Sequence, residues 1–212
     1  LPIEEWDQYK DKFRILGDAR PSIGSYYILS PNDDYLYAEL LEARNLFSVE
    51  KNINIVELCH LLGAKSIKIL SIRIEDMESQ KKIECKLDAS AYLIDGELNS
   101  ERKLLNKIKN NIESEVNFEG GRCDVEKAEQ MLEKNYLNDS ILRKLVRMKR
   151  NEVDGGNKIK DFSLSISLTD SLQKTFDLIA NVDFPTSNFN TKYQSLVKEK
   201  IDISISLKIN FS

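Results

Sequence analysis

Every second residue is apolar in the stretch IDISISLKINF, which occupies positions 201–211. The side chains of a pleated strand point alternately to its two faces, so this period puts Ile, Leu and Phe on one face. Asp, Ser, Lys and Asn then fall on the other face. The apolar residues are also types that favour strands. The stretch therefore predicts a strand whose sheet is buried on one face and solvated on the other.

The same alternation recurs in four other segments of the chain. They are Ile67–Ile74, Ile83–Ala91, Phe162–Leu168 and Phe176–Phe184. The first two predict a hairpin in which Ser66–Glu75 pairs with Lys82–Leu93, because the residues between them are polar and charged, as in a solvated turn. With the C-terminal stretch, these segments predict a mostly antiparallel sheet of about five strands.

Apolar residues at helical spacing and capping residues predict the elements that precede the hairpin. Ser30 and Pro31 suit the first positions of a helix, since serine caps free amides and proline needs no donor there. Asn54, followed three residues later by Glu57, resembles a capping box. The expected elements are a helix at Ile3–Leu16, a short strand at Tyr26–Leu29, a helix from Ser30 to about Phe47 and a short helix from Asn54 that Gly63 closes.

Three further helices are expected between the hairpin and the later strands. They begin at Ser100, at Asp124 and near Asp139–Ser140, and the first has an inward stripe of Leu104, Ile108, Ile112 and Val116. Asp154–Asn157 predicts a turn, and Phe189–Lys198 a loop or short helix. Helices grouped between two groups of strands predict the α+β class, with helices covering one face of the sheet. Residues 1–212 are expected to form a single domain, with residues 97–157 as a helical insertion.

Composition and charge narrow the class of protein. The chain has 212 residues, of which 41% are hydrophobic and 31% charged, and no run approaches the roughly 18 apolar residues of a membrane helix. The net charge of −4 argues against a charge-driven nucleic-acid binder. The acidic N-terminus does not resemble a signal peptide. Three widely spaced cysteines predict free thiols rather than disulfides, which favours a cytoplasmic protein.

Residues that could carry chemistry are few. His60 is the single histidine, so a multi-histidine metal site is excluded and any thiol or serine catalysis would have to use this residue. Gly120 and Gly121 precede a helix, but no Walker sequence or strand–GxGxxG–helix unit accompanies them. Asp124 would also repel a phosphate there. We therefore predict no metal, no cofactor and no catalytic residue.

The helix that begins near Ser140 has one basic face. Arg143, Arg147 and Arg150 follow each other at spacings of four and three residues, with Lys144 beside them. The opposite face carries Ile141, Leu142, Leu145 and Val146. A helix that packs with its apolar face would present the basic one, which could hold phosphates, an anionic lipid surface or an acidic protein. The ordinary interpretation of such a charge run is a solvated face.

These features favour a non-catalytic macromolecular interaction or regulatory domain in the cytoplasm. The expected partner is a protein or a second copy of the chain, reached through the basic helix face or through strand edges. Nucleic acid is weakly supported, because no aromatic residues accompany the basic stripe. One alternative is a membrane-active or pore-forming protein, since alternating strands would also suit a lipid-facing hairpin. The other is an enzyme whose site is assembled from residues distant in sequence.

Overall fold

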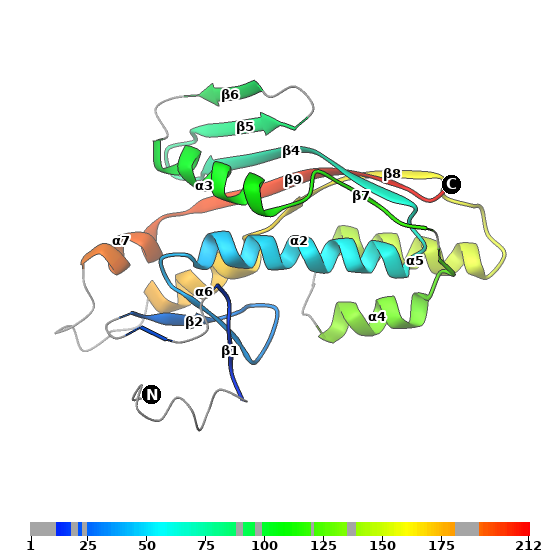
Figure 1. The fold of residues 1–212 in the computed structure, drawn as a ribbon, viewed down its shortest axis with the longest axis horizontal. Coiled ribbons are helices and arrows are strands. Elements are labelled where there is room, and N and C mark those ends of the chain that lie inside the picture. Colours follow the sequence, from blue (N-terminus) through cyan, green and yellow to red (C-terminus); the bar gives the residue numbers. More distant parts are fainter. Residues whose placement is uncertain are drawn as a thin grey trace.

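The computed structural model describes residues 12–17, 21–22, 25–87, 91–95, 99–119, 121–134, 139–180 and 191–212. Within these ranges the chain forms an antiparallel sheet with helices packed against one face, beside a smaller second sheet (Figure 1). The predicted α+β class is therefore confirmed.

The elements are these, in chain order: β1 (Arg14–Ile15), β2 (Tyr27–Leu29), β3 (Leu36–Glu39), α2 (Ala43–Leu61), β4 (Ser66–Asp76), β5 (Lys82–Lys86), β6 (Ala91–Asp95), α3 (Asn99–Asn111), β7 (Glu115–Asn117), α4 (Val125–Lys134), α5 (Ser140–Val153), β8 (Asp161–Ser167), α6 (Asp170–Ala180), α7 (Thr191–Lys198) and β9 (Ile201–Asn210).

The large sheet has the strand order β6-β5-β4-β9-β8, and β7 pairs with the first residues of β4. The C-terminal strand β9 lies in the middle, antiparallel to β4 on one side and to β8 on the other. The apolar residues of β9 are all buried, and the polar residues between them are half-buried or exposed. The alternation from position 201 onward therefore predicted this strand correctly.

The core consists of two clusters that α2 joins. The larger cluster lies between the inner face of the large sheet and helices α2 to α5, and α2 contributes Ile55, Leu58 and Cys59 to it. The smaller one lies between the small sheet, α2, α6 and α7, and α2 contributes Ala43 and Phe47. Figure 1 shows α2 running beneath the large sheet. One long helix thus ties the two parts of the fold together.

The predicted first hairpin is only partly correct. Ser66–Glu75 pairs with Lys82–Lys86 as expected, but the segment Ile83–Ala91 is not one strand. Strand β5 ends at Lys86, and Ala91–Asp95 forms a separate strand, β6, which pairs antiparallel with β5. Residues 88–90 lie outside the described part of the chain, and the alternation of Ile83–Ala91 does not show where the first of the two strands ends.

The predicted strand at Phe176–Phe184 is wrong as far as the structure describes it, because Asp170–Ala180 is helix α6. Leu172 and Phe176 lie four residues apart and are buried on one helical face, whereas Leu178 is 70% exposed. Period two in this segment was therefore accidental. Residues 181–190 lie outside the described residues, and the helix at Thr191–Lys198 agrees with the short helix expected there.

The predicted helix from Ser30 to Phe47 is also wrong in its first half. The N–H of Ser30 donates to the carbonyl of Leu36 across a turn, and Leu36–Glu39 forms strand β3. The helix starts only at Ala43 and continues without a break through the predicted short helix at 54–63. Gly63 ends it as expected, with a φ of +78° that glycine adopts without strain.

Of the two remaining predictions for the N-terminal part, one is confirmed and one is wrong. The short strand at Tyr26–Leu29 is confirmed as β2. The expected helix Ile3–Leu16 is wrong at its end, where Arg14–Ile15 is strand β1 and pairs in parallel with β3; residues 1–11 lie outside the described part of the chain.

The three helices between the strand groups are confirmed, except that Val116 belongs to strand β7 rather than to the helix before it. That residues 97–157 form an insertion in a single domain stays a prediction.

Candidate binding surface

Helix α5 is fixed to the core by its start and by its apolar face. The carboxylate of Asp139 accepts hydrogen bonds from the N–H groups of Ile141 and Leu142, at 2.7 and 3.3 Å, which caps the helix. Leu142, Leu145 and Val146 are buried in the main core. The orientation of the helix is therefore set, and its outer face is held in one position.

The outer face of α5 presents Arg143, Lys144 and Arg147, all exposed. No ion pair within the described part of the chain includes any of these three side chains. They occupy about 6 Å along the helix axis, slightly more than one turn. We call these three residues the basic patch.

Arg150, the fourth residue of the predicted basic stripe, has a carboxylate partner. Its guanidinium binds both carboxylate oxygens of Glu129 on α4, and Nε lies 2.7 Å from Oε1. These hydrogen bonds and the positive charge lower the pKa of Glu129 and raise that of Arg150. Such two-pronged pairs fix geometry as well as charge. Arg150 thus links α4 to α5, while the basic patch lies beside it.

The sequence analysis missed Lys149, which lies on the buried side of α5. Its Nζ is 2.9 Å from Oε2 of Glu152 and 4.4 Å from the centre of the Phe211 ring. Helical spacing would have predicted that Lys149 faces inward, because position 149 continues the buried stripe that Leu142, Leu145 and Val146 begin. A lysine at that position must find partners inside the protein, and it does.

A second basic helix, α3, was also overlooked. It carries Arg102, Lys103, Lys107 and Lys109. The Nζ of Lys107 lies 2.6 Å from a carboxylate oxygen of Glu42, and the Nζ of Lys109 lies 3.6 Å from the sulfur of Cys85. Since two of its cations contact groups of the protein itself, α3 is a weaker candidate than the basic patch.

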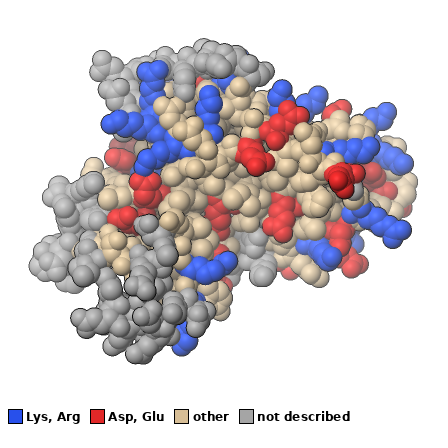
Figure 2. All heavy atoms as spheres, viewed as in Figure 1, with Lys and Arg blue, Asp and Glu red and all other residues tan. Residues whose placement is uncertain are grey.

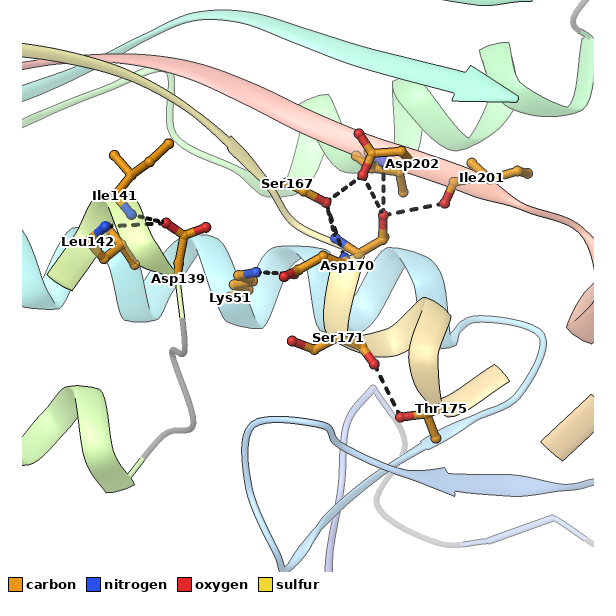
Figure 3. A network of polar contacts seen from close by, with 12 residues as sticks. Lys51, Asp139, Ile141, Leu142, Ser167, Asp170, Ser171, Thr175, Ile201 and Asp202 are labelled. Atoms are coloured by element: carbon orange, nitrogen blue, oxygen red, sulfur yellow. Dashed lines mark hydrogen bonds and ion pairs between the residues drawn. The ribbon is translucent and has the colours of Figure 1, made fainter. Parts of the chain in front are cut away.

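A partly buried polar network joins α2, β8, α6 and β9 (Figure 3). The Lys51 ammonium lies 2.5 Å from Asp170 Oδ1. Ser167 donates to the carboxylate of Asp202 and accepts the N–H of Asp170 at 3.1 Å, while the hydroxyl of Thr169 accepts the N–H of Ile203 at 2.9 Å. These bonds cap α6 and tie it to the sheet. Each of these polar groups has a partner within the protein.

A cavity of about 270 Å³ lies between α2, the end of α3 and the segment after β1. It is lined by Leu16, Leu46, Val49, Glu50, Ile53, Asn54 and Asn111. Its one carboxylate, Glu50, accepts a hydrogen bond from the Ser30 hydroxyl at 3.0 Å. Burial raises the pKa of Glu50 to about 7, although the Ser30 bond opposes this shift.

Replacement of Glu50 by Gln tests how the raised pKa of Glu50 affects the stability of the protein at different pH values. The native state keeps the Glu50 proton up to about pH 7, whereas an unfolded chain loses it near pH 4.5, so stability should fall as the pH rises between these values. In Glu50→Gln this decline is absent. We expect the variant to match the wild type near pH 4 and to exceed it by roughly 2 kcal/mol at pH 8, after allowance for partial exposure. Urea unfolding across this pH range measures the difference.

A second variant checks the cause of that decline. The hydrogen bond from Ser30 lowers the pKa of Glu50, so Ser30→Ala should move the decline to higher pH. A difference between Glu50→Gln and wild type that is the same at all pH values would contradict the account.

The other reactive groups offer no second site within the described residues. His60 is exposed and stacks on Phe118 with ring centres 4.6 Å apart. All three cysteines are free, and burial raises the pKa of Cys59 to about 12, which makes it a poor nucleophile. Nowhere in those residues do three His, Cys, Asp or Glu side chains gather as metal ligands.

Comparison of the chain with protein-family models, with curated proteins and with solved structures gave no match. In the part of the chain that the structure describes, the helices are too short or too polar to cross a bilayer.

Proposed function

We propose that this protein is a non-catalytic interaction or regulatory domain that binds an acidic protein partner through the basic patch, Arg143, Lys144 and Arg147. The observation that carries the proposal is the contrast within one helix. Arg150 and Lys149 have carboxylates at contact distance, while the three neighbouring cations are exposed and none of the described carboxylates pairs with them. Cations held on a rigid element, with their charge available, suit recognition of a negatively charged partner.

The surroundings of the patch favour a protein over a uniform polyanion. Glu126 and Glu129 of α4 and Asp154 lie close enough to Arg150 to affect its pKa. Figure 2 shows basic and acidic side chains side by side at the right-hand end of the molecule, where α4 and α5 lie in Figure 1. Nucleic acid or an anionic membrane would meet these carboxylates as well as the cations, and the net charge of −4 would add to the repulsion.

The size of the patch indicates what it can recognise. Three cations within about 6 Å match two or three carboxylates, such as those on one turn of a partner helix. A cytoplasmic location belongs to the same proposal and is supported by the three free cysteines.

Charge reversal tests the proposal. The probe is a labelled helical peptide with Glu at positions i, i+3 and i+4. The variant Arg143→Glu/Lys144→Glu/Arg147→Glu should bind this peptide at least about tenfold more weakly than the wild type does, because the attraction between the charges becomes repulsion. Thermal unfolding should change little, since the three side chains are exposed and apart from the core. Fluorescence anisotropy at low and high salt measures the affinity.

A matched control carries the same change of net charge elsewhere. Lys65, Lys158 and Lys174 are exposed and lie outside α5, and their joint replacement by Glu should weaken peptide binding far less. An equal loss of peptide affinity in the two triple variants would show that only the net charge matters and would contradict binding through the basic patch. Stronger binding of the wild type to duplex DNA or to phosphatidylserine vesicles than to the peptide would overturn the choice of a protein partner.

A further inference from the structure

Strand β8 forms one edge of the large sheet. It pairs with β9 in an unbroken register from Asp161 to Ser167, and the described residues provide no strand on its other side. The bonds that flank this pairing fix its phase, because the carbonyl of Lys160 accepts from Phe211 and the N–H of Leu168 donates to Ile203. Backbone groups of the even-numbered residues therefore point to β9.

The odd-numbered residues of β8 direct their backbone groups away from β9. No hydrogen bond to a backbone group of Ser163 or Ser165 from the described part of the chain occurs on that side. Their side chains are small and exposed on the outer face of the sheet, so they leave the edge accessible. As far as the chain is described, this edge offers a row of N–H and C=O groups to which another strand could pair.

This edge lacks the usual protection against pairing. Natural edge strands carry lysines, prolines or bulges, or are very short. Between Asp161 and Ser167 there is no lysine, no proline and no register shift, in contrast to the irregularity of β4 between Ile69 and Ser71. An unprotected edge seven residues long is typical of a strand that has a partner.

We propose that the partner is a second copy of this chain, whose β8 pairs antiparallel with this β8 about a two-fold axis at Leu164. Leu164 has a serine on each side, Ser163 and Ser165, so an axis at this residue places identical residues opposite each other. Ser163 then faces Ser165 of the second copy and exchanges two backbone hydrogen bonds with it, as the outward direction of these groups requires.

The other pairs in this register are also compatible. Phe162 faces Ile166 of the second copy on the core side of the sheet, so an apolar residue meets an apolar one. Asp161 faces Ser167, so no like charges are opposed. The two sheets become one continuous sheet with isologous contacts, as two-fold symmetry demands. This inference rests on the sheet edge and goes beyond the proposed function, which uses α5.

Paired charge variants test both the partner and the register. Ser163→Lys/Ser165→Lys places like charges opposite each other across the axis, and so does Ser163→Glu/Ser165→Glu. We expect the wild type to sediment at about twice its 24.4 kDa, each double variant alone to be monomeric, and an equimolar mixture of the two variants to recover the dimer. Sedimentation equilibrium measures the masses, and circular dichroism confirms that each variant is folded.

The control keeps the edge neutral. Ser163→Thr/Ser165→Thr retains every backbone group and should remain dimeric. A wild type that stays monomeric at millimolar concentration, or double variants that remain dimeric, would overturn the proposal. A mixture without dimers would overturn it too. Charge reversal of the basic patch should leave the dimer intact, which separates this test from that of the proposed function.

Discussion

Asp170→Ala is expected to lower the free energy of unfolding by about 3 to 5 kcal/mol, because it leaves the buried Lys51 ammonium without its partner. The Lys51 side chain is 3% exposed and its Nζ lies 2.5 Å from Asp170, which is 37% exposed. A charge that far from water depends on its ion pair. Urea unfolding of the variant and the wild type at neutral pH measures the loss.

Replacement of the other partner, Lys51, shows whether the loss of stability comes from an unpaired buried charge or from the lost contact alone. In Lys51→Met the carboxylate of Asp170 stays partly solvated in the first turn of α6, where negative charge is favourable, so the cost should be smaller. The double variant Lys51→Met/Asp170→Ala removes both charges and should recover most of the stability that Asp170→Ala loses. A double variant as unstable as Asp170→Ala would contradict this account of the pair.

The second large effect is expected in the centre of the sheet. Ile205 is 1% exposed in β9, opposite Ile72 of β4 and Ile166 of β8. Ile205→Ala removes buried methyl groups and leaves a cavity that neighbouring strands cannot close, so the loss should be about 3 kcal/mol or more. Urea unfolding measures this loss.

The neighbouring residue supplies the matched control. Ser204 points to the outer face of the same strand, and Ser204→Ala should change the stability by less than about 0.5 kcal/mol. If Ser204→Ala cost as much as Ile205→Ala, the assignment of the two faces of β9 would be wrong.

Strands β8 and β9 and helices α4 and α5 could be predicted because their signals are local. Alternation in β9 decides which face is buried, and Asp139 caps α5 within its own turn. Helix α6 could not be predicted from the same rule. Phe176 and Leu178 fit a strand period, but only the packing of α6 against α2 and α7 shows that Leu172 and Phe176 define the buried face.

The N-terminal errors have a non-local cause. Ser30 and Pro31 fit a turn as well as a helix start, and strands β1 and β2, which flank β3, decide between them. Such pairing depends on residues far along the chain, which propensity does not contain.

On the candidate surface, too, local features could be predicted from the sequence and contacts between distant residues could not. Helical spacing predicted that Arg143, Arg147 and Arg150 share a face with Lys144 beside them, which is a local property. The pairing of Arg150 with Glu129 joins residues 21 positions apart, and that of Lys51 with Asp170 joins residues 119 apart. Both depend on how helices pack, so the sequence alone could not separate the neutralised cation from the three that form the patch.

The most direct test of the proposed interaction is a map of the backbone amides that respond to the acidic helical peptide. Two-dimensional amide NMR spectra recorded during a titration should show the largest changes at residues 143–147 of α5, with little change in α3. The largest changes at residues 102–109 of α3, or no saturable change in either helix, would contradict the account.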